Sequence, residues 1–325
     1  MKFHGLVLLV ALCCFGGNAQ ITFYATNLPG QVGQFSRTYI STGTDASNLI
    51  GQPGGPRLWD FSQPQQPGET SRRMDVVPPT DGGHGSSFPS ASFAERYTDE
   101  PNGNQSWDYY SVTPNLGRTF FGHYDSSVGS ASPFSPPAID IPNSVGLGTN
   151  WSYAGNAGVG IVTFHLAVSA TADAYGTLVL PQIGVVPALR VNQFNTEQIY
   201  YNGSPISTQY FREYYWLVPG IGKALHIVSD YTSDPASINF TSVNEVRRAF
   251  EVRPWRVANL NLRRQGNTVI LNWRQESNTS GYRVEFLGNL QSNNWQFLAA
   301  PPTNGWPDGS VVTQGQRFYR VIVEP

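Results

Sequence analysis

Cysteine and lysine are the two residue types that this sequence almost lacks. Its 325 residues include only two cysteines, Cys13 and Cys14, and only two lysines, Lys2 and Lys223. Charged residues of all kinds make up 13% of the chain, which is too few for a coiled coil or for a charged disordered tail. So few lysines leave no polybasic surface, and we therefore expect no nucleic-acid partner.

The first 19 residues have the layout of a secretory signal peptide. Lys2 precedes an apolar run from Leu6 to Phe15, and the small residues Gly17 and Ala19 stand where a cleavage site requires them. We therefore expect residues 1–19 to be removed and the mature protein to be secreted or displayed at the cell surface.

Two other interpretations of this segment are a buried N-terminal helix and lipid attachment at Cys13. Attachment needs a small residue before the cysteine, and Leu12 stands there instead. Because both cysteines lie in the predicted signal peptide, the mature chain would have no disulfide, thiol nucleophile or thiolate metal site. No later segment reaches the ~18 apolar residues of a membrane helix, so we expect no transmembrane segment in the mature chain.

The rest of the chain has the composition of an all-β protein. The full sequence is rich in glycine (33), proline (24) and aromatic residues (8 Trp, 16 Tyr and 18 Phe), and no long window has the apolar period of a helix. Two hairpins are predicted at Asn-Gly turns, whose residues tolerate positive φ. One joins Phe93–Thr98 to Ser106–Val112, and the other joins Leu189–Tyr201 to Ile206–Leu217.

Strand 206–217 carries aromatic residues on both of its faces, so we expect it in the middle of a sheet that is covered on both sides. Glycine- and proline-rich stretches at 51–68, 78–92 and 126–149 are predicted to be long connections. The fold class is therefore all-β, with a large antiparallel β-sandwich or curved-sheet domain at 20–250. A second, smaller unit is predicted at 255–325.

The smaller unit resembles a fibronectin type III module. Its strands carry Val269-x-Leu271-x-Trp273 and Gly281-Tyr282-x-Val284, and it closes on Arg317-Phe318-Tyr319-Arg320-Val321. The resemblance implies a small fibronectin type III-like β-sandwich at 255–325, with Trp273 as a core residue between its sheets.

The larger domain is similar to uncharacterised exported β-domains of Bacteroidetes-type and related Gram-negative bacteria. The motifs are Gly176-Thr177 followed by Leu189-Arg190-Val191, then Tyr215-Trp216 followed by Pro219-Gly220-x-Gly222. Leu58-Trp59-Asp60-Phe61 and Asn150-Trp151-Ser152-Tyr153 resemble two further motifs of these domains. The resemblance covers roughly 20–245 and implies a curved sheet, but it implies no catalytic residues.

No catalytic, metal or cofactor site is predicted. The nearest approach to a nucleophile elbow, residues 83–87, lacks the strand-turn-helix context, and His84, His123, His165 and His226 are far apart in sequence. Residues 99–104 carry oxygen ligands at short spacing but fit a hairpin turn better than a calcium loop. The predicted hairpin register places Glu197 opposite Tyr210 and Glu213 opposite Phe194, so these two acids would not be cross-strand neighbours.

Aromatic residues near the two hairpin turns are the remaining candidates for a site, because flat aromatic strips can stack on sugar rings. The candidate ligand-binding residues are Trp107, Tyr109, Tyr110, Tyr210 and Tyr214, although ordinary sheet packing also explains them. We predict an exported, non-catalytic interaction protein with a polysaccharide or a cell-surface component as its partner. The alternatives are a carrier of an apolar ligand in a curved sheet, and a secreted hydrolase with carboxylates from distant loops.

Overall fold

The computed structural model describes residues 21–43, 45, 48–253, 260–273, 281–288, 296–309 and 317–324. The predicted signal peptide lies outside these residues. Strands dominate the described chain and its only helices are three short 3₁₀ turns, which confirms the all-β class. In the part of the chain described, no helix combines the length and the apolar character needed to cross a membrane.

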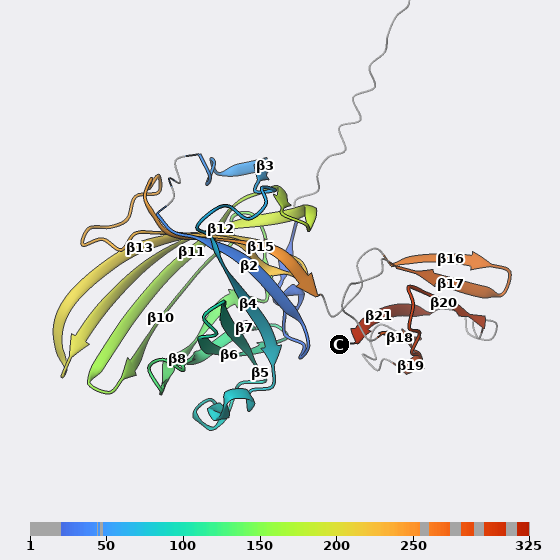
Figure 1. Cartoon of the computed structure of the whole chain (residues 1–325), viewed down its shortest axis with the longest axis horizontal. Coiled ribbons are helices and arrows are strands. Elements are labelled where there is room, and N and C mark those ends of the chain that lie inside the picture. Colours follow the sequence, from blue (N-terminus) through green and yellow to red (C-terminus); the bar gives the residue numbers. More distant parts are fainter. Residues whose placement is uncertain are drawn as a thin grey trace, which may run out of the picture.

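The larger unit is a closed barrel of twelve strands, an arrangement that differs from the predicted β-sandwich or curved-sheet domain. The barrel closes because β10 pairs with β11 on one edge and with β8 on the other (Figure 1). A strongly twisted sheet of this size has two exposed edges unless it curls, and closure removes both of them. In order around the barrel the strands are β10 (Asn150–Val159), β8 (Ser130–Pro142), β7 (Gly117–Asp125), β6 (Gln105–Thr113), β5 (Phe93–Glu100), β4 (Thr70–Val77), β2 (Phe35–Ser41), β15 (Val243–Arg253), β14 (Gly222–Ser229), β13 (Ser204–Val218), β12 (Gly184–Tyr201) and β11 (Val162–Leu180).

Both predicted hairpins are present, as β5–β6 and β12–β13. Asn202 and Gly203 have φ values of +48° and +76°, the conformation that lets a two-residue turn follow the twist of its strands. In the β5–β6 loop only Gly103 has positive φ, at +74°.

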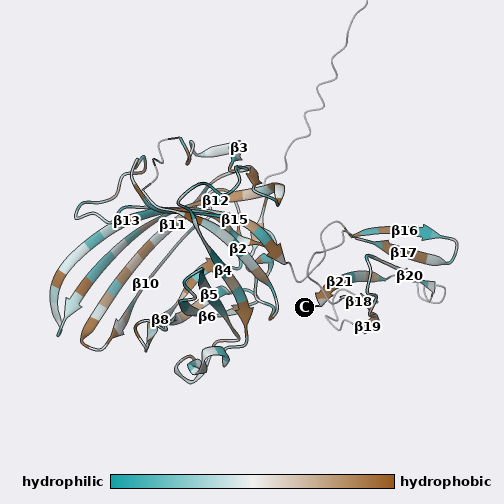
Figure 2. Ribbon diagram, in the orientation of Figure 1, coloured by the Kyte–Doolittle hydropathy of each residue, from teal (hydrophilic) through white to brown (hydrophobic). Residues whose placement is uncertain are grey.

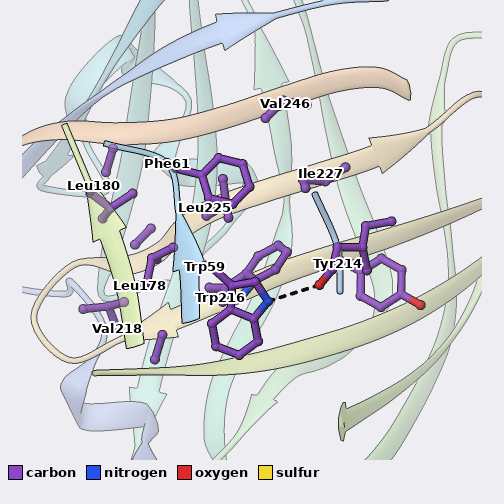
Figure 3. Packing of buried hydrophobic residues seen from close by; sticks show 14 of the residues in the cluster. Trp59, Phe61, Leu178, Leu180, Tyr214, Trp216, Val218, Leu225, Ile227 and Val246 are labelled. Atoms are coloured by element: carbon purple, nitrogen blue, oxygen red, sulfur yellow. Dashed lines mark hydrogen bonds between the residues drawn. The ribbon is translucent and has the colours of Figure 1, made fainter. Parts of the chain in front are cut away.

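Short elements cover the outside of the barrel. Strand β3 (Gly54–Asp60) adds to β11 in parallel, and η2 (Asp81–Gly83) and η3 (Gly85–Ser87) lie in the loop before β5. Trp59, together with Phe61, packs on Trp216 of β13 (Figure 3). Trp216 points outward and Tyr215 inward, and both are fully buried. The expectation that this strand is covered on both sides therefore holds for residues 214–217, whereas Ile206 and Ser207 near the turn are exposed.

An apolar plug fills one end of the barrel. The segment formed by β1 (Phe23–Tyr24), η1 (Ala25–Asn27) and Leu28 pairs with β9 (Ser144–Val145). Phe23 and Leu28 pack against inward-facing side chains of β8, β11, β12 and β13. Figure 2 shows apolar and polar residues alternating along these strands, as expected where opposite faces meet different surroundings.

Two predicted connections contain strands. The stretch 126–149 includes β8 and β9, and the stretch 51–68 includes β3. Their prolines explain the error, because a proline donates no backbone hydrogen bond and argues against a central strand. In β8, Pro136 and Pro137 lie where the pairing with β10 is reduced to Asn156–Ser135.

The C-terminal unit contains two three-stranded sheets. One consists of β16 (Asn261–Gln265), β17 (Thr268–Asn272) and β20 (Gly305–Asp308), and the other of β19 (Gln296–Ala299), β18 (Gly281–Leu287) and β21 (Phe318–Glu324). Side chains of both sheets share one apolar cluster, in which Trp273 packs edge-on against Tyr282 with ring centroids 5.2 Å apart. Trp273 is thus a core residue, as expected from the sequence.

Candidate functional site

The barrel encloses a cavity of about 440 Å³ beyond the plug. Polar residues from most of its strands line the cavity, and they carry both signs of charge. The charged members include Arg72, Glu95, Asp108, Arg118, Glu213 and Arg247. Tyrosines and Phe211 lie between them. The barrel interior is therefore a polar cavity that offers hydrogen-bonding groups and aromatic ring faces, and it is not an apolar pocket.

The first polar cluster surrounds Arg118 of β7. Its guanidinium donates to Glu95 at 2.9 Å and to Asp140 at 2.5 Å, and it lies 4.2 Å from the ring centroid of Tyr110. The Tyr97 hydroxyl donates to Glu95 at 2.6 Å. Burial raises the pKa of Glu95 even though Arg118 opposes the shift, and burial also raises the pKa of Tyr97. The charged members of this cluster are buried and pair with one another, so the cluster holds the wall of the cavity in one arrangement.

The second cluster is an acid–histidine pair at the next strand junction. His123 of β7 lies opposite Asp108 of β6, and its Nδ1 is 2.6 Å from the Asp108 carboxylate. Burial lowers the pKa of His123, but the hydrogen bond and the charge of Asp108 outweigh it and raise the pKa overall. His123 lines the cavity, and its Nε2 atom has no hydrogen-bond partner among the described residues.

The third cluster crosses three strands. The Gln193 amide donates to Asn195 at 2.9 Å, the Asn195 amide lies 3.4 Å from Glu213, and His226 Nε2 lies 2.9 Å from the other Glu213 oxygen. Burial lowers the pKa of His226. Burial opposes the ionisation of Glu213, but the hydrogen bond from His226 and the positive charges of His226, Lys223 and Arg247 lower its pKa overall. At neutral pH, a Glu213 carboxylate therefore accepts hydrogen bonds from a neutral imidazole and an amide.

Cations complete the lining. Arg72 pairs with Asp99 at 2.6 Å, and Arg247 pairs with Glu245. Lys223 lies at the plugged end, with its Nζ 4.5 Å from the ring centroid of Tyr215. In the described chain, no group of three or more histidine, cysteine or acidic side chains could hold a metal ion.

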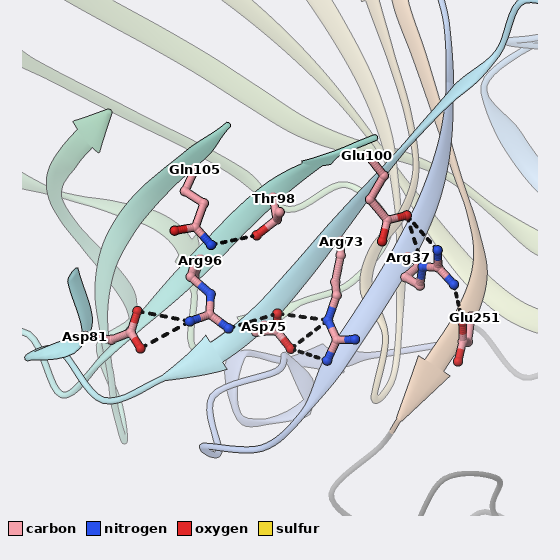
Figure 4. Close-up of polar contacts among 9 residues, drawn as sticks. All are labelled: Arg37, Arg73, Asp75, Asp81, Arg96, Thr98, Glu100, Gln105 and Glu251. Atoms are coloured by element: carbon pink, nitrogen blue, oxygen red, sulfur yellow. Dashed lines mark hydrogen bonds and ion pairs between the residues drawn. The ribbon is translucent and has the colours of Figure 1, made fainter. Parts of the chain in front are cut away.

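The outer face of strands β2, β4 and β5 is also charged. Arg96 bridges Asp75 and Asp81, Arg73 pairs with Asp75, and Arg37 joins Glu100 to Glu251 (Figure 4). Strands β2, β4 and β5 thus carry polar residues on both faces, so hydrophobic alternation cannot reveal which face is internal. This is why sequence analysis missed the clusters on these strands.

The five aromatic candidates do not form an exposed strip. Trp107 and Tyr109 lie under the 78–92 loop, where the Trp107 indole donates to Asp81 at 2.8 Å and Tyr109 stacks on Phe88. Tyr214 is buried on the outside, with its hydroxyl donating to the Ile238 carbonyl, and Tyr210 is half-buried beside Thr232. Only Tyr110 lines the cavity. The other four contact residues of neighbouring loops.

The predicted register of the β12–β13 hairpin is wrong by one residue. Glu213 lies opposite Gln193 and Glu197 opposite Gln209, because the pairing shifts between Ile199 and Tyr200. A shift of one residue exchanges the two faces of a strand. The two acids are still not cross-strand neighbours, but Glu213 faces a polar interior rather than the Phe194 ring.

The four histidines that look unrelated in the sequence separate into two sets. His84 stacks on Tyr124, and the His165 ring lies tilted against the Tyr200 ring with centroids 4.3 Å apart. His123 and His226 line the same cavity, each in contact with a carboxylate.

No protein-family model matches the sequence, and no curated protein or solved structure matches it either.

Proposed function

We propose that this protein is an exported, non-catalytic binding protein whose barrel takes up a small sugar-like ligand. The polar cavity carries the proposal. Its volume of about 440 Å³ falls within the ~300–1,000 Å³ of small-molecule sites. Amide, carboxylate and imidazole groups can bind hydroxyls, while tyrosine rings can pack against the C–H face of a sugar.

The same lining argues against an apolar ligand. A hydrocarbon chain would displace water from Glu213, Asp108 and Lys223 without replacing the hydrogen bonds, and uncompensated burial of charge is costly. A ligand with many hydroxyls replaces those hydrogen bonds. We therefore favour a carbohydrate over the apolar cargo of the carrier hypothesis.

The C-terminal unit has a separate role in this proposal. Its six strands and the shared cluster around Trp273 support a fibronectin type III-like module. Such a module would act as a spacer or attachment element at the cell surface. The N-terminal sequence pattern supports export.

The hydrolase hypothesis keeps one observation in its favour. Asp108 holds His123 Nδ1 at 2.6 Å, the arrangement that orients an imidazole for proton transfer through its other nitrogen. Turnover in a glycosidase and esterase panel that His123→Gln abolishes would establish this second function. We expect no turnover.

Binding inside the barrel is tested by calorimetric titration of the full chain with mono- and disaccharides and, separately, with palmitate. Ser106→Trp would fill the cavity that Ser106 lines. Ser111→Trp is the matched control on the same strand, at an odd position that faces away from the interior. We expect sugars to bind the parent protein and the control but not Ser106→Trp. Binding of palmitate alone would favour the carrier, and sugar binding that survives Ser106→Trp would overturn the interior site.

A further inference from the structure

Lys223 stands at the closed end of the cavity. It lies opposite Leu217 in the β13–β14 pairing, and Leu217 packs against the apolar plug. Pro29, Ile221 and Gly222 line the cavity beside it. Its ammonium lies over the Tyr215 ring at 4.5 Å, so the aromatic face holds the side chain toward the interior.

Lys223 differs from every other cation of the cavity wall. Arg72, Arg118 and Arg247 each contact at least one carboxylate. Among the described residues, Lys223 has an aromatic contact but no ion pair within 4.0 Å. An ammonium in a partly enclosed, low-dielectric site gains more from an anion than an exposed one does.

Acceptor groups lie further along the same wall. Glu213 receives donors from His226 and Asn195, and each carboxylate oxygen can accept another hydrogen bond. Gln193 donates from its amide nitrogen to Asn195, and among the described residues no donor contacts its carbonyl oxygen. This part of the wall suits ligand hydroxyls, which can donate to both groups.

We propose that the ligand is a sugar acid, with its carboxylate on Lys223 and its hydroxyls on Glu213 and Gln193. This inference rests on the proposed function and specifies its substrate class. A neutral sugar would satisfy the acceptors but would leave the Lys223 ammonium without a direct ion-pair partner. A simple carboxylic acid would meet Lys223 but would leave the acceptors without donors.

The test compares matched pairs of sugars by calorimetry. D-glucuronate against D-glucose, and D-galacturonate against D-galactose, differ mainly in the carboxylate. We expect each acid to bind the full chain at least about tenfold more tightly than its neutral partner, which corresponds to ~1.4 kcal/mol. Equal affinity of acid and neutral sugar for the parent protein would overturn the inference while leaving the proposed function in place.

Variants locate the preference. Lys223→Met removes the charge and is expected to abolish the difference between acid and neutral sugar, whereas Lys223→Arg is expected to keep it. Arg57→Met, in the exposed strand β3, is the control for a general loss of positive charge. A preference that survives Lys223→Met in a folded protein would contradict the inference. Failure of every sugar to bind the parent protein would instead overturn the proposed function itself.

Discussion

At the scale of single residues, buried charges that satisfy one another shape this barrel. Arg118 illustrates the principle, because its side chain is 4% exposed and the two carboxylates that it holds are 6% and 9% exposed. Removing one member of such a cluster leaves the others charged in a low-dielectric interior. Surface pairs lack this penalty because water replaces the missing partner.

Arg118→Met is therefore expected to destabilise the protein by about 3–5 kcal/mol. Arg72→Met provides the comparison, because Arg72 and Asp99 are 25% and 39% exposed and such pairs contribute ~0–1 kcal/mol. Urea unfolding of both variants measures the difference. Equal losses of stability would contradict the internal position of the Arg118 cluster.

The two cavity histidines are expected to change stability with pH in opposite directions. The pKa of His226 is lowered in the folded protein, so the unfolded chain binds the proton first, and stability is lost as the pH falls below about 6.5. The pKa of His123 is raised, so its contribution is present below about 6.5 and is lost as the pH rises through its folded value.

Denaturant unfolding at pH 8 and pH 5.5 tests these signs. Compared with the parent protein, His226→Gln is expected to lose less stability on acidification, because glutamine does not take up the proton. His123→Gln is expected to lose more, because it lacks the protonated imidazole beside Asp108. If both variants lose the same amount of stability between pH 8 and pH 5.5, the two histidines do not have opposite pKa shifts.

At the scale of elements, local turn chemistry could be predicted but face assignment could not. Asn202-Gly203 identified its hairpin, since both residues adopt the positive φ that the turn needs. A shift of one residue beside that turn then reversed the inferred environment of Glu213. Sequence alternation also could not distinguish the interior of β5, with Glu95 and Tyr97, from its exterior, with Arg96. Register and closure come from long-range pairing, which local sequence does not encode.

Strand β3 can pair with β11 only because residue 176 of β11 is a glycine. A Cβ on Gly176 of β11 would lie 2.0 Å from the Arg57 carbonyl oxygen, so Gly176→Ala is expected to displace β3 and expose the indoles of Trp59 and Trp216. A red shift in tryptophan emission and faster proteolysis within 51–68 would report this. Gly288→Ala, which meets no atom within 4 Å, is expected to change neither. An unaltered spectrum for Gly176→Ala would contradict the parallel pairing.

At the scale of the whole molecule, closure of the barrel is uneven. Strands β11 and β12 pair along nearly their full length, whereas β8 and β10 share only Asn156–Ser135. Backbone amides of β10 that point toward β8 therefore have few hydrogen-bond partners on β8, because the prolines of β8 interrupt the pairing between the two strands. We expect this seam to be the least protected line around the barrel.

Hydrogen exchange measured by mass spectrometry tests the seam. Peptides within 150–159 are expected to exchange a large share of their amides rapidly, whereas peptides within 189–196 stay protected on both sides. Equal protection of the two segments would mean that β8 and β10 are joined by more hydrogen bonds than the single bridge provides.

The central claim is that ligand binds inside the barrel and not on its aromatic surface. The most direct measurement is the set of intermolecular nuclear Overhauser effects between the tightest-binding sugar and labelled aromatic rings of the full chain. Contacts to the rings of Tyr97, Tyr153 and Phe211, which line the cavity, are the predicted result. Contacts confined to the outward-facing rings of Tyr200 and Tyr210 would contradict it.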